Sequence, residues 1–340
     1  MIDINYHLAD CDDKKRIIEF LDLNWGEKHP LVHIEDFFNY YYCTNNNFIN
    51  FAIAEDKNTK EIQAICGFIP CNKNSTDIWV SIWCSNKNKG SMGVGLELMS
   101  KMQELTNANN ISCNNIRPET IPFYNFLGYT AKRIPHYYLL NNNMEYKIAK
   151  IENKTLIKSI INKKISLIPI TSINEIDNFN INEFKKPQKD LWHIKRRYFN
   201  FPYKKYQLFF CVENNKKIAI LVIEHIKVND SSVLRIVDFI GDENIFAQLN
   251  LALNSLLNTY NSEYIDCYMY GYSNDTFNKC GFIERVEGDV NIIPNYLEPP
   301  LYKNIEYYFF TNNTDNFTMW KADGDQNRPN IKSTRCSPPL

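Results

Sequence analysis

Three glycines lie within six residues in the segment CSNKNKGSMGVGLELMSKMQ, which runs from Cys84 to Gln103. Since the chain has only 11 glycines among 340 residues, Gly90, Gly93 and Gly95 form a local cluster. Backbone N–H groups at the start of a helix bind anions, and glycines let phosphate oxygens come close to the backbone. The segment therefore predicts a phosphate-binding loop, and Lys87 and Lys89 add positive charge to it.

The elements around the glycines fit such a loop. In DIWVSIWC, from Asp77, the aliphatic residues Ile78, Val80 and Ile82 occupy every second position. Because the segment is also rich in β-forming residues, it predicts a strand before the loop. After the loop, GLELMSKMQELTNA has apolar residues at helical spacing and predicts an amphipathic helix. A short strand in ISCNNI, a short helix that ends at Gly128 and another strand follow.

The same order of elements recurs in the second half, in SVLRIVDFIGD, ENIFAQLNLALNSLLNTY, YIDCYMYG and NDTFNKCGFIERV. FYNFLGY (Phe123–Tyr129) aligns with TFNKCGF (Thr276–Phe282), which pairs Gly128 with Gly281. Two β-rich runs around a polar turn precede each copy. We therefore predict an internal duplication and a mixed α/β fold of two tandem domains, residues 1–145 and 146–340.

The glycine loop and FYNFLGY together resemble the GNAT superfamily of acyl-CoA-dependent N-acyltransferases, although Gly90 stands where those proteins usually have Arg or Gln. The resemblance implies that the loop binds the pyrophosphate of acyl-CoA and that Tyr124 protonates the departing thiolate, the alternative being that Tyr124 only packs a helix. It also implies that backbone N–H groups near Trp83 stabilise the thioester oxyanion. The residues expected to bind acyl-CoA are Ile82, Trp83, Cys84, Lys89, Gly90, Ser91, Met92, Gly93, Val94, Gly95 and Asn114.

The second copy differs at both of these places. Asp242 and Glu243 follow its strand where the pyrophosphate would lie, and carboxylates repel phosphate. Phe277 stands at the position of Tyr124. We therefore expect the first domain to bind the acyl donor.

The segments WHIKRRYFNFPYKKY, RIVDFIGD and KADGDQNRPN resemble two-domain bacterial sugar N-acyltransferases of this superfamily, which act in surface polysaccharide (lipopolysaccharide, O-antigen) assembly. The resemblance implies a dTDP- or UDP-linked amino-deoxysugar as acceptor and an acetyl or short hydroxyacyl group, such as 3-hydroxybutyryl. Arg suits bidentate contacts with a diphosphate, and tyrosines stack on a base; a basic surface helix and a solvated tail are the structural alternatives. The residues expected to bind the acceptor are His193, Arg196, Arg197, Tyr198, Asp323, Asp325 and Arg328.

The acceptor's ammonium group must lose a proton before it attacks, so a general base is expected. Asp238, in an apolar strand, and His136 are the candidates, and Asp238 also suits a structural carboxylate. No cysteine has a neighbouring His in sequence, which favours direct attack in a ternary complex over a covalent acyl-enzyme.

Charge, hydrophobic runs and cysteine spacing argue against several other classes of function. A net charge of -1 and a pI of about 6.6 disfavour nucleic-acid binding. No export signal or apolar run of membrane-spanning length is visible, and the ten cysteines lack metal-ligand spacing, so we expect a cytoplasmic protein without a metal, monomeric or homodimeric. An aminoacyl-tRNA-dependent transferase of the Fem type and a non-catalytic binding module remain the alternatives.

Overall fold

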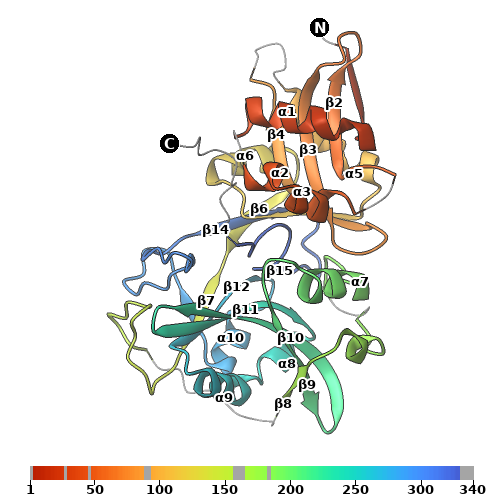
Figure 1. The fold of residues 1–340 in the computed structure, drawn as a ribbon. Coiled ribbons are helices and arrows are strands. Elements are labelled where there is room, and N and C mark those ends of the chain that lie inside the picture. The colour runs from red at the N-terminus through yellow and green to blue at the C-terminus, as the bar shows by residue number, and fades with distance from the viewer. Residues whose placement is uncertain are drawn as a thin grey trace, which may run out of the picture. The chain divides into compact units, whose positions relative to one another are not determined.

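The computed structural model describes residues 3–26, 29–44, 47–87, 93–155, 165–181 and 185–329 (Figure 1). The described residues form two compact units. Unit 1 comprises the chain up to Ala131 together with Phe310–Asn313, and unit 2 comprises Lys132–Phe309 and Thr314–Pro329. The chain thus passes from unit 1 to unit 2 after Ala131. The domain boundary expected from the sequence, at residue 145, stays a prediction.

Unit 1 is built on a seven-stranded sheet with the order β1-β2-β3-β4-β5-β14-β6. β1 to β4 are antiparallel neighbours, and β4 pairs with β5 in parallel. The strands are β1 (Ile4–Leu8), β2 (Phe51–Asp56), β3 (Ile62–Pro70), β4 (Asp77–Ser85), β5 (Asn110–Asn114), β6 (Thr130–Ile134) and β14 (Tyr307–Thr311). The helices are α1 (Lys14–Asn24), α2 (Pro30–His33), α3 (Glu35–Tyr42), α4 (Val94–Ser100), α5 (Met102–Thr106) and α6 (Ile121–Phe126).

Unit 2 repeats this plan with the order β13-β7-β12-β11-β10-β9-β8, and β15 pairs with β12 beside that path. β8 to β11 are antiparallel neighbours, and β11 pairs with β12 in parallel. The strands are β7 (His136–Leu140), β8 (Ser166–Ile170), β9 (Gln207–Glu213), β10 (Lys216–Val228), β11 (Ser231–Ile240), β12 (Tyr264–Tyr270), β13 (Ile283–Arg285) and β15 (Met319–Trp320). The helices are α7 (Leu191–Ile194), which continues into the π-helical turn Lys195–Phe199, α8 (Glu243–Phe246), α9 (Asn250–Tyr260) and α10 (Asn274–Cys280).

Each sheet includes one strand from the other half of the chain. In unit 2, β7, from the first half of the sequence, lies between β12 and β13. In the sheet of unit 1, the late strand β14 lies between β5 and β6. Each repeat thus contributes the strand after β6 or β13 to the other sheet, where it lies second from the edge. The predicted mixed α/β class with a repeated order of elements is confirmed.

The matching strands β4 and β11 share a further irregularity. The register between β3 and β4 shifts so that Ser81 is an extra residue, and the register between β10 and β11 shifts so that Val237 is extra. Such a bulge adds local twist and bends the strand. In both units the bulge lies just beyond the last residue that pairs with the parallel neighbour. That residue is Trp79 in β4 and Ile236 in β11.

Apolar side chains cover both faces of the unit 2 sheet. Leu249, Leu253 and Leu257, from α9 and the residue before it, pack against one face, which includes Ile236. Ile194 and Tyr198 pack against the other face, which includes Phe210. Burial of this apolar surface is the main stabilising contribution expected for such a sheet.

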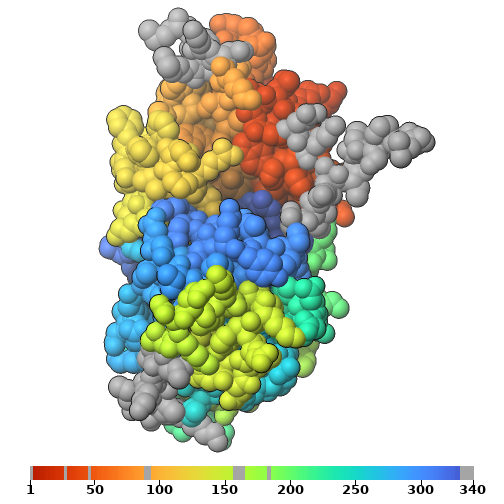
Figure 2. All heavy atoms as spheres, turned by 90° about the vertical axis from the view of Figure 1, so that its left-hand side faces the viewer, coloured from red at the N-terminus to blue at the C-terminus, as the bar shows by residue number. Residues whose placement is uncertain are grey.

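The segment that follows β7 is held on unit 2 by one buried carboxylate. Glu263 accepts hydrogen bonds from the backbone N–H groups of Lys147, Ile148 and Ala149. Lys150 then pairs with Ile292, so the yellow-green and blue surfaces adjoin in Figure 2. In the part of the chain that the structure describes, no helix is both long and apolar enough to span a membrane.

Candidate functional site

The described glycines of the predicted loop have two different structural roles. Gly93 precedes α4 with a φ of 88°, a left-handed conformation that favours glycine. A Cβ atom on Gly95 would lie 2.0 Å from the Oγ of Ser85, so glycine lets α4 approach β4 closely. The expected ligands Lys89, Gly90, Ser91 and Met92 lie outside the described residues.

β4 and β5 are paired over only a short distance. Their parallel pairing covers Asp77–Trp79 and Asn110–Ser112, although β4 continues to Ser85. Among the described strands, β4 has no other partner on that side. Ile82, Trp83 and Cys84, where the thioester is expected, pair with β3 on one side and lie beyond the pairing with β5 on the other.

Trp83 connects the start of α4 to Tyr124. Its indole Nε1 donates a hydrogen bond to the carbonyl of Gly95 at 3.0 Å, and its ring lies 5.5 Å from the ring of Tyr124. Tyr124, in α6, is 4% exposed and stacks on Phe310 at 4.1 Å. Burial raises the pKa of Tyr124, so its phenol stays protonated and can act as an acid.

The other predicted donor residues that the structure describes are buried, and their roles in binding acyl-CoA stay predictions. Ile82 and Val94 are buried, and Asn114 is buried at the end of β5. Cys84 is also buried, and burial raises the pKa of its thiol to about 11, which keeps it from being a nucleophilic thiolate. The structure thus brings together Trp83, Gly95 and Tyr124 of the predicted donor residues.

In unit 2 the corresponding helix start already holds carboxylates. The side chain of Asp242 accepts a hydrogen bond from the backbone N–H of Asn244 at 2.7 Å and so caps α8. Glu243 accepts a hydrogen bond from the backbone N–H of Ser273 at 2.7 Å. Phe277, the counterpart of Tyr124, stacks on Tyr137 at 3.6 Å and carries no hydroxyl.

In unit 2 the space where β11 and β12 diverge is also occupied. Their parallel pairing ends at Ile236 and Cys267. Beyond it, Trp320 of β15 pairs with Met269 of β12, and the N–H of Ala322 donates to the carbonyl of Val237 in β11 at 3.0 Å. The segment that contains β15 therefore lies in the place that no described strand fills in unit 1.

The polar segment Lys321–Arg328 is folded into unit 2. Asp323, with an exposure of 0%, binds the Nζ of Lys189 at 2.7 Å, and Asp238 binds the same atom at 2.8 Å. Burial raises the pKa of Asp323 to about 6, although Lys189 opposes this change. Asp238 also accepts a hydrogen bond from the hydroxyl of Tyr198 at 2.5 Å and one from the N–H of Phe239. Its two oxygens are therefore engaged by partners within unit 2.

The predicted acceptor ligand Arg197 also points inward. Its guanidinium donates to the carbonyls of Ala322 and Gln326 at 3.2 and 2.7 Å and to the hydroxyl of Tyr206 at 2.9 Å. Since the side chain is 2% exposed, it holds the polar segment in place. The role of Arg197 in binding a diphosphate stays a prediction.

The remaining predicted acceptor ligands lie within this segment or in the helical turn around Ile194. Arg328 forms an ion pair with Asp325. The guanidinium of Arg196 lies over the ring of Trp192 at 5.3 Å. His193 is buried, and burial lowers its pKa well below the ordinary value, so it is neutral at pH 7.

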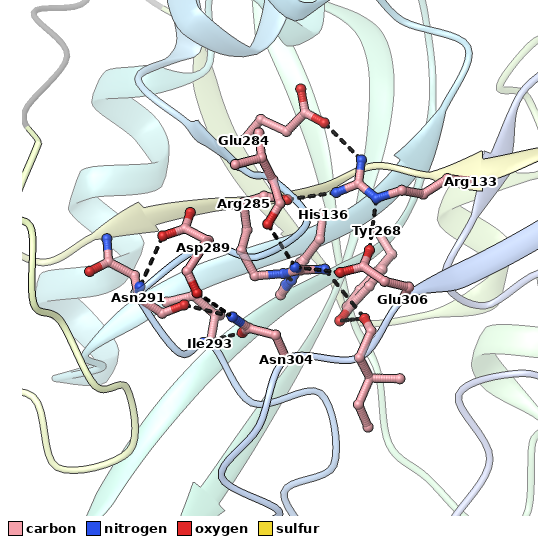
Figure 3. A network of polar contacts seen from close by, with 12 residues as sticks. Arg133, His136, Tyr268, Glu284, Arg285, Asp289, Asn291, Ile293, Asn304 and Glu306 are labelled. Carbon is pink, nitrogen blue, oxygen red and sulfur yellow. Dashed lines mark hydrogen bonds and ion pairs between the residues drawn. The ribbon is translucent and has the colours of Figure 1, made fainter.

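His136 belongs to a separate buried network in unit 2 (Figure 3). The Nε of Arg285 donates to its Nδ1 at 3.0 Å, so Nε2 carries the hydrogen and donates to Asp266 at 3.2 Å. Burial lowers the pKa of His136 to about 4, with Arg285 and Arg235 acting in the same direction. Both ring nitrogens are thus engaged, and the ring itself stacks on Tyr268 at 3.9 Å.

An aromatic groove lies near the end of the π-helical turn. It has a volume of about 490 Å³, and its lining includes Tyr198, Phe199, Tyr203, Lys204 and Tyr206. Aromatic faces beside lysines suit a base and its phosphates. Phe199 and Tyr203 are visible as aromatics in the sequence, but only the fold shows that they share a groove.

Comparison with solved structures identifies the fold. A GCN5-related N-acetyltransferase from Anabaena variabilis matches 90% of this chain and 72% of its own, with a TM-score of 0.55 and 11% identity. A conserved protein of unknown function from Enterococcus faecalis, described as a probable N-acyltransferase, matches 91% and 72%, with a TM-score of 0.53 and 9% identity. No protein-family model and no curated protein sequence matches the chain. The chain therefore has the GCN5-related N-acetyltransferase fold, with two tandem copies of its sheet.

Proposed function

We propose that the protein is an acyl-CoA-dependent N-acyltransferase in which unit 1 binds the acyl donor. The observation that carries the proposal is the difference between the two copies at one place. In unit 2, β15 occupies the space where β11 and β12 diverge, and Asp242 caps α8, which follows β11. In unit 1, no described strand lies between the diverging parts of β4 and β5, and Gly93 precedes α4.

The chemistry proposed for unit 1 follows from the residues around the free end of β4. Backbone N–H groups near Trp83 stabilise the oxyanion when an amine attacks the thioester carbonyl carbon. The carbon–sulfur bond then breaks, the phenol of Tyr124 donates its proton to the thiolate, and the nitrogen of the new amide releases one proton to solvent, from which Tyr124 regains its own. We propose that the acyl group passes directly to the amine in a ternary complex, and the raised pKa of the Cys84 thiol agrees with this.

We further propose that unit 2 binds the acceptor, a nucleotide-linked amino sugar. The aromatic groove supports this assignment, since its size suits a ligand of this class. Tyr203 or Phe199 would stack on the base, and Lys204 and Lys205 would approach the diphosphate. The nucleotide is a UDP or dTDP group, as the resemblance of the sequence implies.

Titration with acetyl-CoA in a calorimeter tests the donor half. We expect wild type to bind and Gly93→Asp to bind at least about tenfold more weakly, because a carboxylate would face the pyrophosphate. Gly288→Asp is the matched control, since both glycines have a positive φ and no atom of the described residues within 4 Å of an added Cβ. A wild type without binding heat at millimolar acetyl-CoA contradicts the proposal and favours a binding module or an aminoacyl-tRNA-dependent transferase.

Thiol release tests the reaction itself. The protein is incubated with acetyl-CoA or 3-hydroxybutyryl-CoA and a panel of UDP- and dTDP-linked amino sugars. We expect release with at least one acceptor that carries a free amine and none with the matching hydroxy sugar. Release that is equal for both sugars would mean that the acceptor nitrogen plays no part.

A further inference from the structure

Asn327, in the polar segment Lys321–Arg328, is bound to the supports of the aromatic groove. Its side-chain nitrogen Nδ2 donates a hydrogen bond to Oε2 of Glu224 at 2.8 Å and one to the hydroxyl of Tyr206 at 3.2 Å. The other oxygen of Glu224, Oε1, binds the ammonium group of Lys204. Lys204 and Tyr206 both line the groove, so a single amide group is linked to both of them.

Both hydrogens of the Asn327 amide are used in this arrangement. An amide nitrogen carries two hydrogens, and here one has a carboxylate oxygen and the other a phenol oxygen as its acceptor. Asn327 is 7% exposed and Glu224 is 6% exposed, so the hydrogen bond between them is shielded from water. Because the amide oxygen would repel the carboxylate, the charge of Glu224 fixes which way the amide points.

The backbone of Asn327 contributes to the same arrangement. Its φ of 54° is left-handed, a conformation that Asn, Asp and Gly adopt more readily than other residues. Its carbonyl accepts a hydrogen bond from the hydroxyl of Tyr206 at 3.3 Å. Arg197 donates to that hydroxyl at 2.9 Å and to the carbonyl of Gln326 at 2.7 Å. The hydroxyl of Tyr206 is thus held both by the polar segment and by the π-helical turn.

These contacts order side chains that a ligand in the groove would meet. The ammonium group of Lys204 carries three hydrogens, and among the described residues only Glu224 accepts a hydrogen bond from it. The other hydrogens can therefore contact a phosphate while Glu224 keeps the side chain in place. A side chain that is already ordered loses less entropy when a ligand binds, which favours binding.

We propose, resting on the proposed function, that Asn327 is a positioning residue for the nucleotide of the acceptor. Through Glu224 it holds the ammonium group of Lys204 for the diphosphate, and through Tyr206 it holds an aromatic ring that lines the groove. Asn327 itself does not line the groove. It therefore acts on the acceptor through Lys204 and Tyr206, whereas the sequence predicts direct ligands in this segment.

Asn327→Asp tests this role, because Asp keeps the size of the side chain and suits the left-handed backbone but cannot donate to Glu224. UDP and dTDP are the probes, and calorimetry with the whole protein measures their affinities. We expect wild type to bind at least one of them and Asn327→Asp to bind it at least about tenfold more weakly, because a hydrogen bond to a charged group is lost. Asn229→Asp is the matched control, since Asn229 also has a positive φ, of 53°, but is exposed, and we expect no change in affinity.

A reciprocal exchange separates positioning from general damage to the fold. In the double variant Glu224→Gln/Asn327→Asp the amide and the carboxylate change places, so the hydrogen bond can form again with the donor on the other side. We expect nucleotide affinity to recover to within about threefold of wild type, and no recovery would overturn the assignment. Asn327→Gly keeps the backbone conformation and adds no charge. It should also bind the nucleotide about tenfold more weakly, and an unchanged affinity would count against the role.

Kinetics supply a readout that a purely structural role would not move. With an acceptor that supports thiol release, Asn327→Asp should raise the KM for the acceptor at least about tenfold while kcat at saturation stays within about threefold. The KM for acetyl-CoA should not change, because the donor is expected to bind unit 1. A wild type that binds neither UDP nor dTDP overturns the proposed acceptor and the role of Asn327 together. A wild type that binds one of them, with unchanged affinity in Asn327→Asp and Asn327→Gly, overturns the role of Asn327 alone.

Discussion

His136 provides a quantitative test of the buried network in unit 2. We replace it with Gln, whose amide can accept the hydrogen bond from Arg285 and donate one to Asp266 but does not titrate. In the folded protein the pKa of His136 is about 4, lowered from 6.5 chiefly by burial. Stability from the neutral ring is therefore fully present above pH 6.5 and is lost as the pH falls toward 4.

The size of this loss follows from the two pKa values. At 1.36 kcal/mol for each pH unit, the change from 6.5 to about 4 corresponds to roughly 3 kcal/mol. The free energy of unfolding is measured by urea titration at pH 7 and at pH 4 for wild type and His136→Gln. Asp266, whose pKa is held at about 2 by Arg235 against the effect of burial, stays ionised in both proteins.

We expect wild type to lose roughly 3 kcal/mol more than His136→Gln between pH 7 and pH 4. Asp323 takes up a proton in the same window but does so in both proteins, so its effect cancels in the comparison. Losses that agree within about 1 kcal/mol would refute the assignment of His136 as a buried neutral link. The variant should also keep thiol release at pH 7 within about threefold, because Arg285 and Asp266 engage both ring nitrogens of His136 and leave neither to take a proton from the acceptor.

Two further predictions concern unit 1. Tyr124→Phe keeps the stacking on Phe310 and should lower kcat by about 100-fold with little change in acetyl-CoA affinity. The control Tyr129→Phe, in the same aromatic cluster, should keep kcat within about threefold. Equal effects of the two substitutions in stopped-flow thiol assays would contradict the role of Tyr124 as an acid. Gly95→Ala should cost about 1–3 kcal/mol in urea unfolding because its Cβ would lie 2.0 Å from Ser85 Oγ, and Ser85→Ala should recover part of that cost; no recovery would locate the strain elsewhere.

Local patterns predict the order of elements well, because that order depends on neighbouring residues. The strand at Asp77–Ser85, the helix that follows Gly93 and their second copies are all present in the structure. The alignment of Gly128 with Gly281 also holds, since both have a positive φ after a short helix. These features need only hydrophobic spacing and glycine conformations, which a single sequence carries.

Long-range pairing could not be predicted in the same way. Nothing in HYYLL indicates that β7 pairs with β12 more than a hundred residues later, because strand pairing depends on tertiary contacts. From the sequence, Arg197 is expected to bind the acceptor or to lie on a basic surface helix. In the structure its guanidinium donates hydrogen bonds to the carbonyls of Ala322 and Gln326.

The central claim is that unit 1, and not unit 2, binds the pyrophosphate and acyl arm of the donor. A crystal structure of the complex with acetyl-CoA tests it most directly. We predict the acyl arm between the free ends of β4 and β5 and the pyrophosphate at the backbone N–H groups before α4. Acetyl-CoA bound between β11 and β12, with β15 displaced, would contradict the account.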